Sequence, residues 1–240
     1  MPLTWIFDLD NTLHDASHAI FPAINTNMNV YIANVLGGAS GPADIAAVNA
    51  VRIEYWKRYG ATLLGMVKHH QVKAEEFLRE AHAFDDLSAM IRTERGLARL
   101  LRRLPGKKIL LTNAPRRYSH DVLRHIGLHR HFAKHLPIEA MHVHRRLRPK
   151  PSRALLRKVL AKERLIARQS VLVEDSIENL KAAKALGMHT VWVTQYLRTK
   201  PSAQLATGAL ATLDATRHPA YVDVKVKSVR QINDHMHRLR

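Results

Sequence analysis

The chain has 240 residues, 46% of them hydrophobic, and its 38 Lys and Arg against 20 Asp and Glu give a formal net charge of +18 at pH 7. This length allows one large domain, or a core domain with a smaller one. The chain has no apolar run of 18 residues, so we expect no transmembrane helix. It has no cysteine, which excludes disulfides, thiolate zinc sites and cysteine nucleophiles. The N-terminus shows no signal-peptide pattern, so we expect a cytoplasmic protein.

The positive charge raises the question of a nucleic-acid partner. Basic residues are spread along most of the chain, and aromatic residues interleave with them only around Tyr55 to Tyr59. Nucleic-acid binders usually concentrate their basic residues on one face or helix. We therefore favour a basic surface that attracts phosphorylated small molecules and keep a nucleic-acid or polyanion binder as an alternative. The 16 histidines show no compact ligand spacing, so we do not expect structural zinc.

The first element is a short apolar run, Thr4 to Phe7, that runs directly into Asp8, Asp10 and Thr12. Such a run is typical of a strand buried on both faces of a parallel sheet. Period-2 geometry would aim the two carboxylates the same way. Because adjacent carboxylates repel each other unless a cation or a shared proton intervenes, this pattern favours a metal site. Oxygen ligands in a chain without cysteine favour Mg²⁺.

Residues 14–90 lack strong strand signals and show helical periodicity instead. We predict helices at Ile20 to Leu36, Ile45 to Arg58, Thr62 to Val67 and Ala74 to Ala81. These helices indicate an all-helical domain, residues 14–90, inserted into a core made of residues 1–13 and 91–240.

From residue 93 onward, strands and helices alternate, which predicts a doubly wound parallel sheet and an α/β fold. The strands are expected at Lys108 to Leu111, Ser170 to Val173, Thr190 to Val193 and 222–226, with at most a short one in 132–138. The helices are expected at Glu94 to Leu104, Tyr118 to Ile126, Arg153 to Leu160 and Ile177 to Leu186. Residues 145–151 are interpreted as a basic loop, and the polar segment 199–219 is unassigned.

Three predicted strands end in polar, reactive residues, and a lysine lies in the loop before a helix. These residues are Asp8, Asp10, Thr12, Thr112, Asn113, Glu174, Asp175 and Lys150. In a parallel sheet such strand ends converge on one edge, where ligands bind. The set supplies an oxygen nucleophile, a proton donor, ligands for a divalent cation and donors for phosphoryl oxygens, which is what phosphoryl transfer requires.

Each member also has a simpler explanation when taken alone. Thr112-Asn113 can begin a turn, Lys150 can be a solvated surface lysine, and Glu174-Asp175 can be acids at a helix N-terminus. Their joint occurrence in this order, each at an element boundary, favours the functional interpretation.

The combined pattern resembles the haloacid dehalogenase-like superfamily over essentially the whole chain. The motifs are Asp8-Leu9-Asp10-Asn11-Thr12, Leu111-Thr112-Asn113, Lys150-Pro151 and Glu174-Asp175-Ser176-Ile177-Glu178-Asn179. The resemblance implies that Asp8 attacks phosphorus to form an aspartyl phosphate and that Asp10 is the acid and base. It also implies phosphate binding by Thr112, Asn113 and Lys150, with Mg²⁺ held by Asp8, the Asp10 carbonyl, Asp175 and, in or near its shell, Glu174. The helical insert would be a cap that closes over the site.

A narrower resemblance concerns this insert. The segment Tyr59-Gly60-Ala61-Thr62-Leu63-Leu64-Gly65-Met66 is similar to the cap of pyrimidine 5′-nucleotidase-type members. It implies that Tyr59, Thr62 and Leu63 line the pocket for the leaving group. The alternative is that Tyr55, Trp56, Tyr59 and Leu63, at helical spacing, form the core of the cap. Met66 stands in place of the usual leucine and Glu174 in place of a frequent aspartate.

We therefore expect a Mg²⁺-dependent phosphomonoester hydrolase acting on a small phosphorylated metabolite, specifically a pyrimidine nucleoside monophosphate. The enzymatic alternatives are a phosphatase for phosphoglycolate or a sugar phosphate, and a β-phosphoglucomutase-like phosphotransferase. The alternative of another class is the basic polyanion binder on the same fold.

Overall fold

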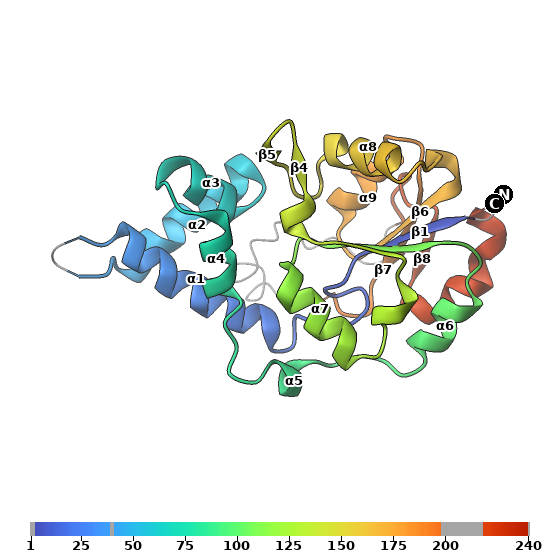
Figure 1. Cartoon of the computed structure of the whole chain (residues 1–240), viewed down its shortest axis with the longest axis horizontal. Coiled ribbons are helices and arrows are strands. Elements are labelled where there is room, and N and C mark those ends of the chain that lie inside the picture. Colours follow the sequence, from blue (N-terminus) through green and yellow to red (C-terminus); the bar gives the residue numbers. More distant parts are fainter. Residues whose placement is uncertain (1–2, 39–40, 198–217, 240) are drawn as a thin grey trace. The chain divides into compact units, whose positions relative to one another are not determined.

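The computed structural model describes residues 3–38, 41–197 and 218–239. They divide into two compact units (Figure 1). The core unit holds the described residues of 3–16, 91–197 and 218–239, and the helical unit holds those of 17–90. None of the helices in these described ranges has the length and apolar character needed to cross a lipid bilayer. Residues 199–217 of the unassigned polar segment lie outside the described residues.

A six-stranded sheet in the order β3-β2-β1-β6-β7-β8 is the centre of the core unit. All five neighbouring pairs run parallel, which confirms the predicted doubly wound α/β fold. The strands are β1 Thr4–Phe7, β2 Lys108–Leu111, β3 Lys134–Leu136, β6 Ser170–Glu174, β7 His189–Val193 and β8 Val224–Val226.

The strand order places the reactive strand ends next to each other. β1 lies between β2 and β6, with Phe7 opposite Leu110 on one side and Val173 on the other. The amide of Asp8 continues this pairing by donating to the Val173 carbonyl at 3.0 Å. The carboxyl ends of three adjacent strands therefore deliver Asp8, Thr112 and Glu174 to one edge of the sheet.

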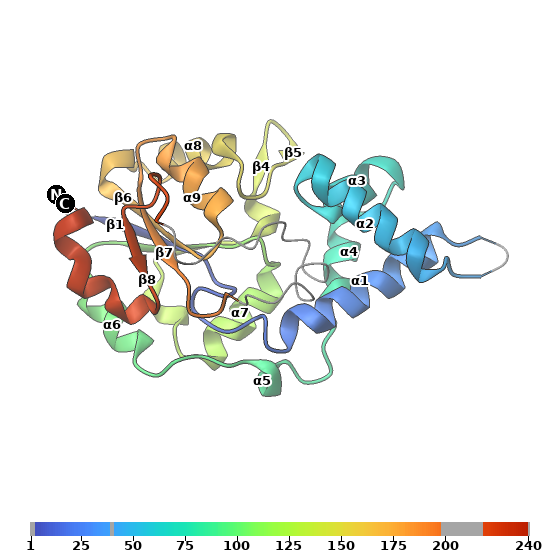
Figure 2. The ribbon, with the colours of Figure 1, turned by 180° about the vertical axis from the view of Figure 1, so that it is seen from behind.

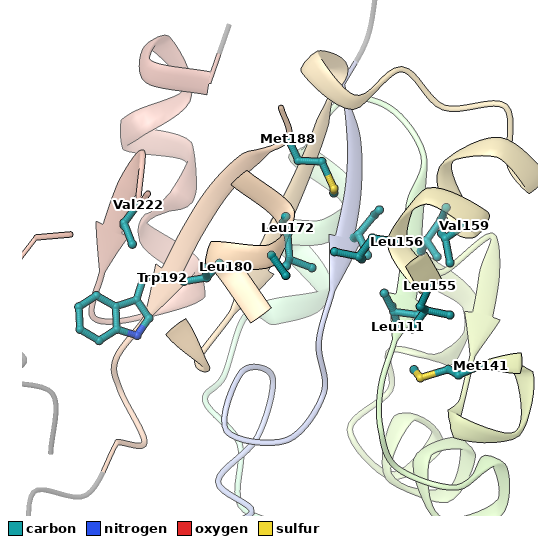
Figure 3. Packing of buried hydrophobic residues seen from close by; sticks show 14 residues of the cluster. Leu111, Met141, Leu155, Leu156, Val159, Leu172, Leu180, Met188, Trp192 and Val222 are labelled. Atoms are coloured by element: carbon teal, nitrogen blue, oxygen red, sulfur yellow. The ribbon is translucent and has the colours of Figure 1, made fainter. Parts of the chain in front are cut away.

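Helices cover both faces of the sheet (Figure 2). They are α6 Leu97–Arg103, α7 Arg116–His125, α8 Arg153–Lys162 and α9 Ile177–Lys184. Alternate strand residues face opposite layers, so Ile6 belongs to the cluster under α8 and α9, whereas Phe7 contacts Phe132 edge-on on the other face. Figure 3 shows the first cluster, with Leu155, Leu156 and Leu180 over the strands that carry Leu111 and Leu172. This packing on both faces explains why the strands are continuous apolar runs.

The helical unit contains α1 Ile20–Leu36, α2 Ile45–Tyr59, α3 Thr62–His69, α4 Ala74–Ala81 and the short α5 Leu87–Met90. Helix α2 begins at the N-cap Asp44, whose carboxylate accepts from the Ala47 amide at 2.8 Å, and ends at Gly60 with φ of 78°. The Arg52 guanidinium ties α2 to α1 by donating to Asn25 and Asn29 at 2.5 and 2.6 Å.

The structure departs from the sequence predictions in several places. The predicted basic loop 145–151 contains β5 Arg146–Leu147, which forms a two-residue hairpin with β4 His142–Val143. The helix expected from Glu94 begins only at Leu97, because Gly96 has φ of 93° and breaks the helical conformation. A 3₁₀ helix, η4 Val229–Leu239, was not predicted, and further 3₁₀ turns lie at His129–His131, Ile138–Ala140 and Ala167–Gln169.

Candidate active site

Asp8 and Lys150 form a buried ion pair at the end of β1. The Lys150 ammonium lies 2.5 Å from Asp8 Oδ1 and 2.7 Å from Glu174 Oε2, with side-chain exposures of 3%, 8% and 1%. The second oxygen of Asp8 accepts from the Thr12 hydroxyl at 3.3 Å. Burial acts to lower the pKa of Lys150, but Asp8 and Glu174 outweigh it and raise that pKa above its usual value. The lysine is therefore a fixed positive charge beside two carboxylates.

Asn113 holds the backbone of Lys150 in place. Its amide nitrogen donates to the Lys150 carbonyl at 3.1 Å, and its amide oxygen accepts from the Lys150 amide at 2.9 Å. This two-way contact joins the end of β2 to the loop before α8, across 37 positions of the chain. The structure thus gives the Asn113 side chain a bracing contact; its predicted role in phosphate binding remains a prediction.

Thr112 is the first residue after β2 and is 1% exposed. Its amide donates to the Leu136 carbonyl at 3.1 Å, which extends the β2–β3 pairing by one step. The Thr112 hydroxyl oxygen accepts from the Ala114 amide at 3.1 Å. That hydroxyl is fixed within its own turn, and its proton can be given to another oxygen.

Asp8, Glu174 and Asp175 form a cluster of oxygen ligands. One carboxylate oxygen from each lies within 4.8 Å of the others. Burial, followed by the neighbouring Glu174, raises the pKa of Asp8 to about 8 despite the lysine. Burial and Glu174 likewise raise the pKa of Asp175 well above its usual value. The raised pKa values mean that ionising all three acids beside one lysine is unfavourable. A divalent cation with oxygen preference would relieve that repulsion and fits this donor set.

Within this cluster, Glu174 already has two partners. Its Oε2 accepts from Lys150 at 2.7 Å and its Oε1 from the Ser176 amide at 3.3 Å, at the start of α9. Asp8 likewise has two partners, Lys150 and the Thr12 hydroxyl. All three carboxylates are therefore candidate ligands for a cation.

Asp10 makes hydrogen bonds that the sequence reasoning missed. Its Oδ1 accepts from the Tyr118 hydroxyl at 2.6 Å and lies 2.9 Å from His14 Nε2. Burial and Asp10 raise the pKa of Tyr118 well above its usual value, so its hydroxyl stays protonated and donates. His14 and Tyr118 are 0% and 3% exposed. The i, i+4 spacing of Asp10 and His14 was a weak signal in the sequence, whereas Tyr118, 108 positions away, gave none.

The predicted substrate residues Tyr59, Thr62 and Leu63 lie in the helical unit. Leu63 is 5% exposed and belongs to the apolar interior of that unit. The Thr62 hydroxyl donates to the Arg52 carbonyl at 3.5 Å. Tyr59 lies nearer the surface: its hydroxyl lies 2.5 Å from His69 Nε2, and the Lys68 ammonium lies 5.2 Å from its ring centroid. Tyr59 and Thr62 are partly exposed, whereas Leu63 is buried.

The fold is shared with solved structures. The chain is similar to a HAD phosphatase from Thermococcus onnurineus, with a TM-score of 0.61 and 16% identity, covering 98% of both chains. It is similar to a predicted phosphoglycolate phosphatase from Haemophilus somnus 129pt, with a TM-score of 0.57 and 17% identity, covering 98% of both chains. A 2-haloacid dehalogenase from Pseudomonas syringae pv. Tomato DC3000 has a TM-score of 0.57 and 18% identity, covering 100% of both chains. At these identities the likeness shows the fold alone.

The family follows from a different comparison. The model of the family described as haloacid dehalogenase-like hydrolase matches residues 5–193. This range contains all of β1 except Thr4, the described helices of residues 17–90, and the positions of Asp8, Thr112, Lys150 and Glu174. The chain therefore belongs to the haloacid dehalogenase-like hydrolase family.

Proposed function

We propose that the protein is a Mg²⁺-dependent phosphomonoester hydrolase that works through an aspartyl-phosphate intermediate. The observation that carries the proposal is the pairing of two differently held aspartates on one loop. Asp8 is buried against Lys150, whereas Asp10 is half-buried and hydrogen-bonded to a tyrosine and a histidine. Two carboxyl groups in different environments can divide the roles of nucleophile and acid.

The proposed metal is Mg²⁺, held by Asp8, Asp175 and the backbone carbonyl of Asp10, with Glu174 beside it. When bound, this ion would neutralise the phosphoryl charge and orient the ester for attack. Lys150 adds a fixed positive charge next to Asp8, where phosphoryl oxygens would gather. The Thr112 hydroxyl supplies a neutral donor at the end of the neighbouring strand.

In the first step, a carboxylate oxygen of Asp8 attacks the phosphorus atom and the bond to the ester oxygen breaks. Asp10 gives its proton to the departing oxygen, so that an alcohol leaves rather than an alkoxide. In the second step, Asp10 takes a proton from a water molecule, whose oxygen attacks the same phosphorus. Asp8 is then released as a carboxylate and inorganic phosphate is formed. Atoms and protons balance over the two steps.

The second aspartate favours phosphate chemistry over dehalogenation. A halide ion is a stable leaving group and needs no proton, whereas an alkoxide does. Asp10 would have no acid role in a dehalogenase. Its hydrogen bonds to Tyr118 and His14 are better explained by proton transfer to an oxygen.

For the substrate, we propose a pyrimidine nucleoside 5′-monophosphate. The support is the sequence from Tyr59 to Met66 in the helical unit, together with the surface position of Tyr59 between His69 and Lys68. An aromatic ring with neighbouring cationic and imidazole groups suits a planar base and an anionic ester. A phosphatase for phosphoglycolate or sugar phosphates is the first alternative.

A β-phosphoglucomutase-like activity is the second alternative, because it would use the same pair of aspartates. A mutase returns the phosphoryl group to the sugar, so it releases no inorganic phosphate. The polyanion binder is the third alternative, and it would bind DNA in a salt-sensitive way without turnover.

The test is release of inorganic phosphate from UMP, CMP, dTMP, AMP, phosphoglycolate and glucose 1-phosphate, with and without Mg²⁺. We expect Mg²⁺-dependent release that is strongest with the pyrimidine nucleotides. Release from another ester would retain the mechanism and reject the substrate. Absence of release from all six would reject the hydrolase on this panel and turn attention to the mutase and polyanion-binding alternatives.

A further inference from the structure

Asp10 is held by two residues to which the pattern of family motifs assigns no role. Tyr118 Oη and His14 Nε2 both approach the same oxygen, Oδ1, at 2.6 and 2.9 Å. The two partners are themselves 3.5 Å apart, and their rings lie 6.5 Å apart between centroids. All three residues belong to the core unit. The arrangement is therefore a compact triad around one carboxylate oxygen.

The chemistry of the triad fixes the direction of its hydrogen bonds. An ionised carboxylate only accepts, so in that state the His14 ring must carry its proton on Nε2. Each carboxylate oxygen has about two lone-pair positions, and Oδ1 uses them for the tyrosine and the histidine. In that state Oδ1 is thus held by two donors.

The two partners are anchored by their own surroundings. Tyr118 lies in the first turn of α7, where the Arg116 amide donates to Glu139 at 2.9 Å and the Ser119 hydroxyl lies 2.8 Å from His135 Nε2. The loop of His14 is tied down by the Thr93 hydroxyl, which donates to the Leu13 carbonyl at 2.8 Å. Groups anchored in this way can hold a reacting carboxyl in one orientation.

His14 shows a further sign of a specific role. Its ring is 0% exposed, and among the described residues its Nδ1 atom has no hydrogen-bond partner. A buried polar atom of this kind lowers the stability of the fold. An apolar residue would avoid that cost at this position, so the contact of Nε2 with Asp10 gives a reason for a histidine here.

We propose that Tyr118 and His14 are positioning residues that fix the Asp10 carboxyl through Oδ1 and so aim it at the leaving oxygen and later at water. This inference rests on the proposed phosphomonoesterase activity and adds the residues that aim its acid and base. Neither residue touches the substrate in this account. Removing either hydrogen bond would leave the nucleophile intact and misplace the proton donor.

The test uses two aryl esters of similar shape, 4-nitrophenyl phosphate and phenyl phosphate. The more basic phenolate of phenyl phosphate needs a proton to leave, whereas 4-nitrophenolate leaves readily without one. The value of kcat/KM reports the first irreversible step, which is cleavage of the ester bond. A misplaced acid should therefore lower kcat/KM for phenyl phosphate more than for 4-nitrophenyl phosphate.

For Tyr118→Phe, which removes only the hydroxyl, we expect kcat/KM to fall about 10- to 100-fold on phenyl phosphate, part of the usual range of general acid catalysis. On 4-nitrophenyl phosphate we expect a fall of no more than about threefold, because little proton donation is lost there. Rapid-quench samples should also show more phosphoenzyme than in the wild type, because Asp10 is the base for its hydrolysis. The matched control is Tyr221→Phe, which removes a hydroxyl from a half-buried tyrosine of the same unit. It should leave kcat/KM unchanged on both esters.

His14 supplies a second, independent variant. His14→Gln keeps an N–H donor and should retain most of the activity, whereas His14→Leu removes it and should repeat the selective loss on phenyl phosphate. Melting temperatures show whether each variant is folded. The rise in melting temperature with Mg²⁺ should be unchanged in folded variants, since Asp10 would bind the ion through its backbone carbonyl.

Equal losses on both esters, or no loss on either, in folded Tyr118→Phe and His14→Leu would overturn the inference while leaving the hydrolase in place. A wild-type protein that releases phosphate from neither aryl ester and from none of the six metabolite esters in the presence of Mg²⁺ would overturn the proposed function, and the inference with it. The two failures are therefore distinguishable in the same assay.

Discussion

The two units of the chain use their polar residues in different ways. In the core unit, the reactive side chains lie at the ends of adjacent strands, are largely buried, and are fixed by hydrogen bonds such as those of Asp8, Lys150 and Asp10. In the helical unit, Tyr59 and His69 form their contacts near the surface of a helix pair. The difference suggests that the core unit carries the chemistry and that the helical unit carries the choice of substrate.

The largest expected effect is that of Asp8→Asn. An amide is a poor nucleophile, and loss of a nucleophile costs on the order of 10⁵-fold or more in kcat in well-studied enzymes. We expect loss of turnover on every ester, with folding retained, as measured by phosphate release and circular dichroism. Preparations must be free of deamidated protein, since reversion to aspartate would restore activity. Substantial turnover by a clean sample would contradict the division of labour between the units.

A smaller effect is expected for Asp10→Asn. This variant loses the acid and the base but keeps the nucleophile and Lys150. We expect kcat to fall about 10²–10⁴-fold, the usual contribution of general acid–base catalysis. Rapid-quench measurements on phenyl phosphate should show that both ester cleavage and hydrolysis of the phosphoenzyme are slowed. If only one of the two steps slowed, a group other than Asp10 would be the acid or base in the step that did not slow.

A structural test of the helical unit is Gly65→Ala. A Cβ atom at Gly65 in α3 would overlap the ring of Tyr55 in α2. Overpacking of this kind costs typically about 1–3 kcal/mol of unfolding free energy. We expect a lower melting temperature and a higher KM for nucleotides, with less change in kcat on 4-nitrophenyl phosphate. Gly38→Ala is the control, because no atom of the described residues lies within 4 Å of the Cβ position there. Equal loss of kcat on all esters would show that the two functions are not separable.

The smallest effect, a slight change in stability, is expected from a substitution at Asp223. The carboxylate of Asp223 accepts from Lys184 at 2.5 Å and from the amide of Thr190 at 2.9 Å. Thr190 lies at the amino end of β7. Although burial opposes them, these hydrogen bonds lower the pKa of Asp223. A lowered pKa in the folded state adds stability above the unfolded value of about 4, and that stability is lost as the pH falls below it.

Asp223→Asn should therefore lower the melting temperature slightly at pH 7. The difference in melting temperature between this variant and the wild type should shrink below about pH 4, where the carboxylate of Asp223 in the wild type becomes protonated. Activity should not change, since the residue lies at the opposite end of the strands from Asp8. A difference that stayed constant down to pH 3 would mean that the charge of Asp223 adds nothing to stability.

Much of the core could be predicted from sequence because a buried parallel strand must be apolar on both faces. Lys108 to Leu111 and the strand that begins at Ser170 are of this kind, and polar residues after such runs mark their carboxyl ends. The hairpin at 142–147 could not be predicted, since strands of two residues have no measurable period. Its basic residues favour a loop by composition alone.

Within the site, the residues at strand ends could be identified from the sequence, but the residues that hydrogen-bond to them could not. Thr112, Lys150 and Asp175 follow from strand ends and element boundaries. The contacts of Asp10 with His14 and Tyr118 depend on how α7 packs beside the first loop. His14 and Tyr118 are 104 positions apart in the sequence. Side-chain packing of this range leaves no periodic trace. The placement of Tyr59 near the surface and Leu63 in the interior is set by packing in the same way.

The most direct test of the central claim is to trap the phosphoenzyme. The wild-type protein would be mixed with 4-nitrophenyl phosphate and Mg²⁺, quenched in acid within milliseconds, digested and analysed by mass spectrometry. We expect one phosphoryl group per chain, attached to Asp8, which disappears as inorganic phosphate is released. Steady turnover with no phosphoryl group on Asp8 at any time, or with the group on another residue, would contradict it.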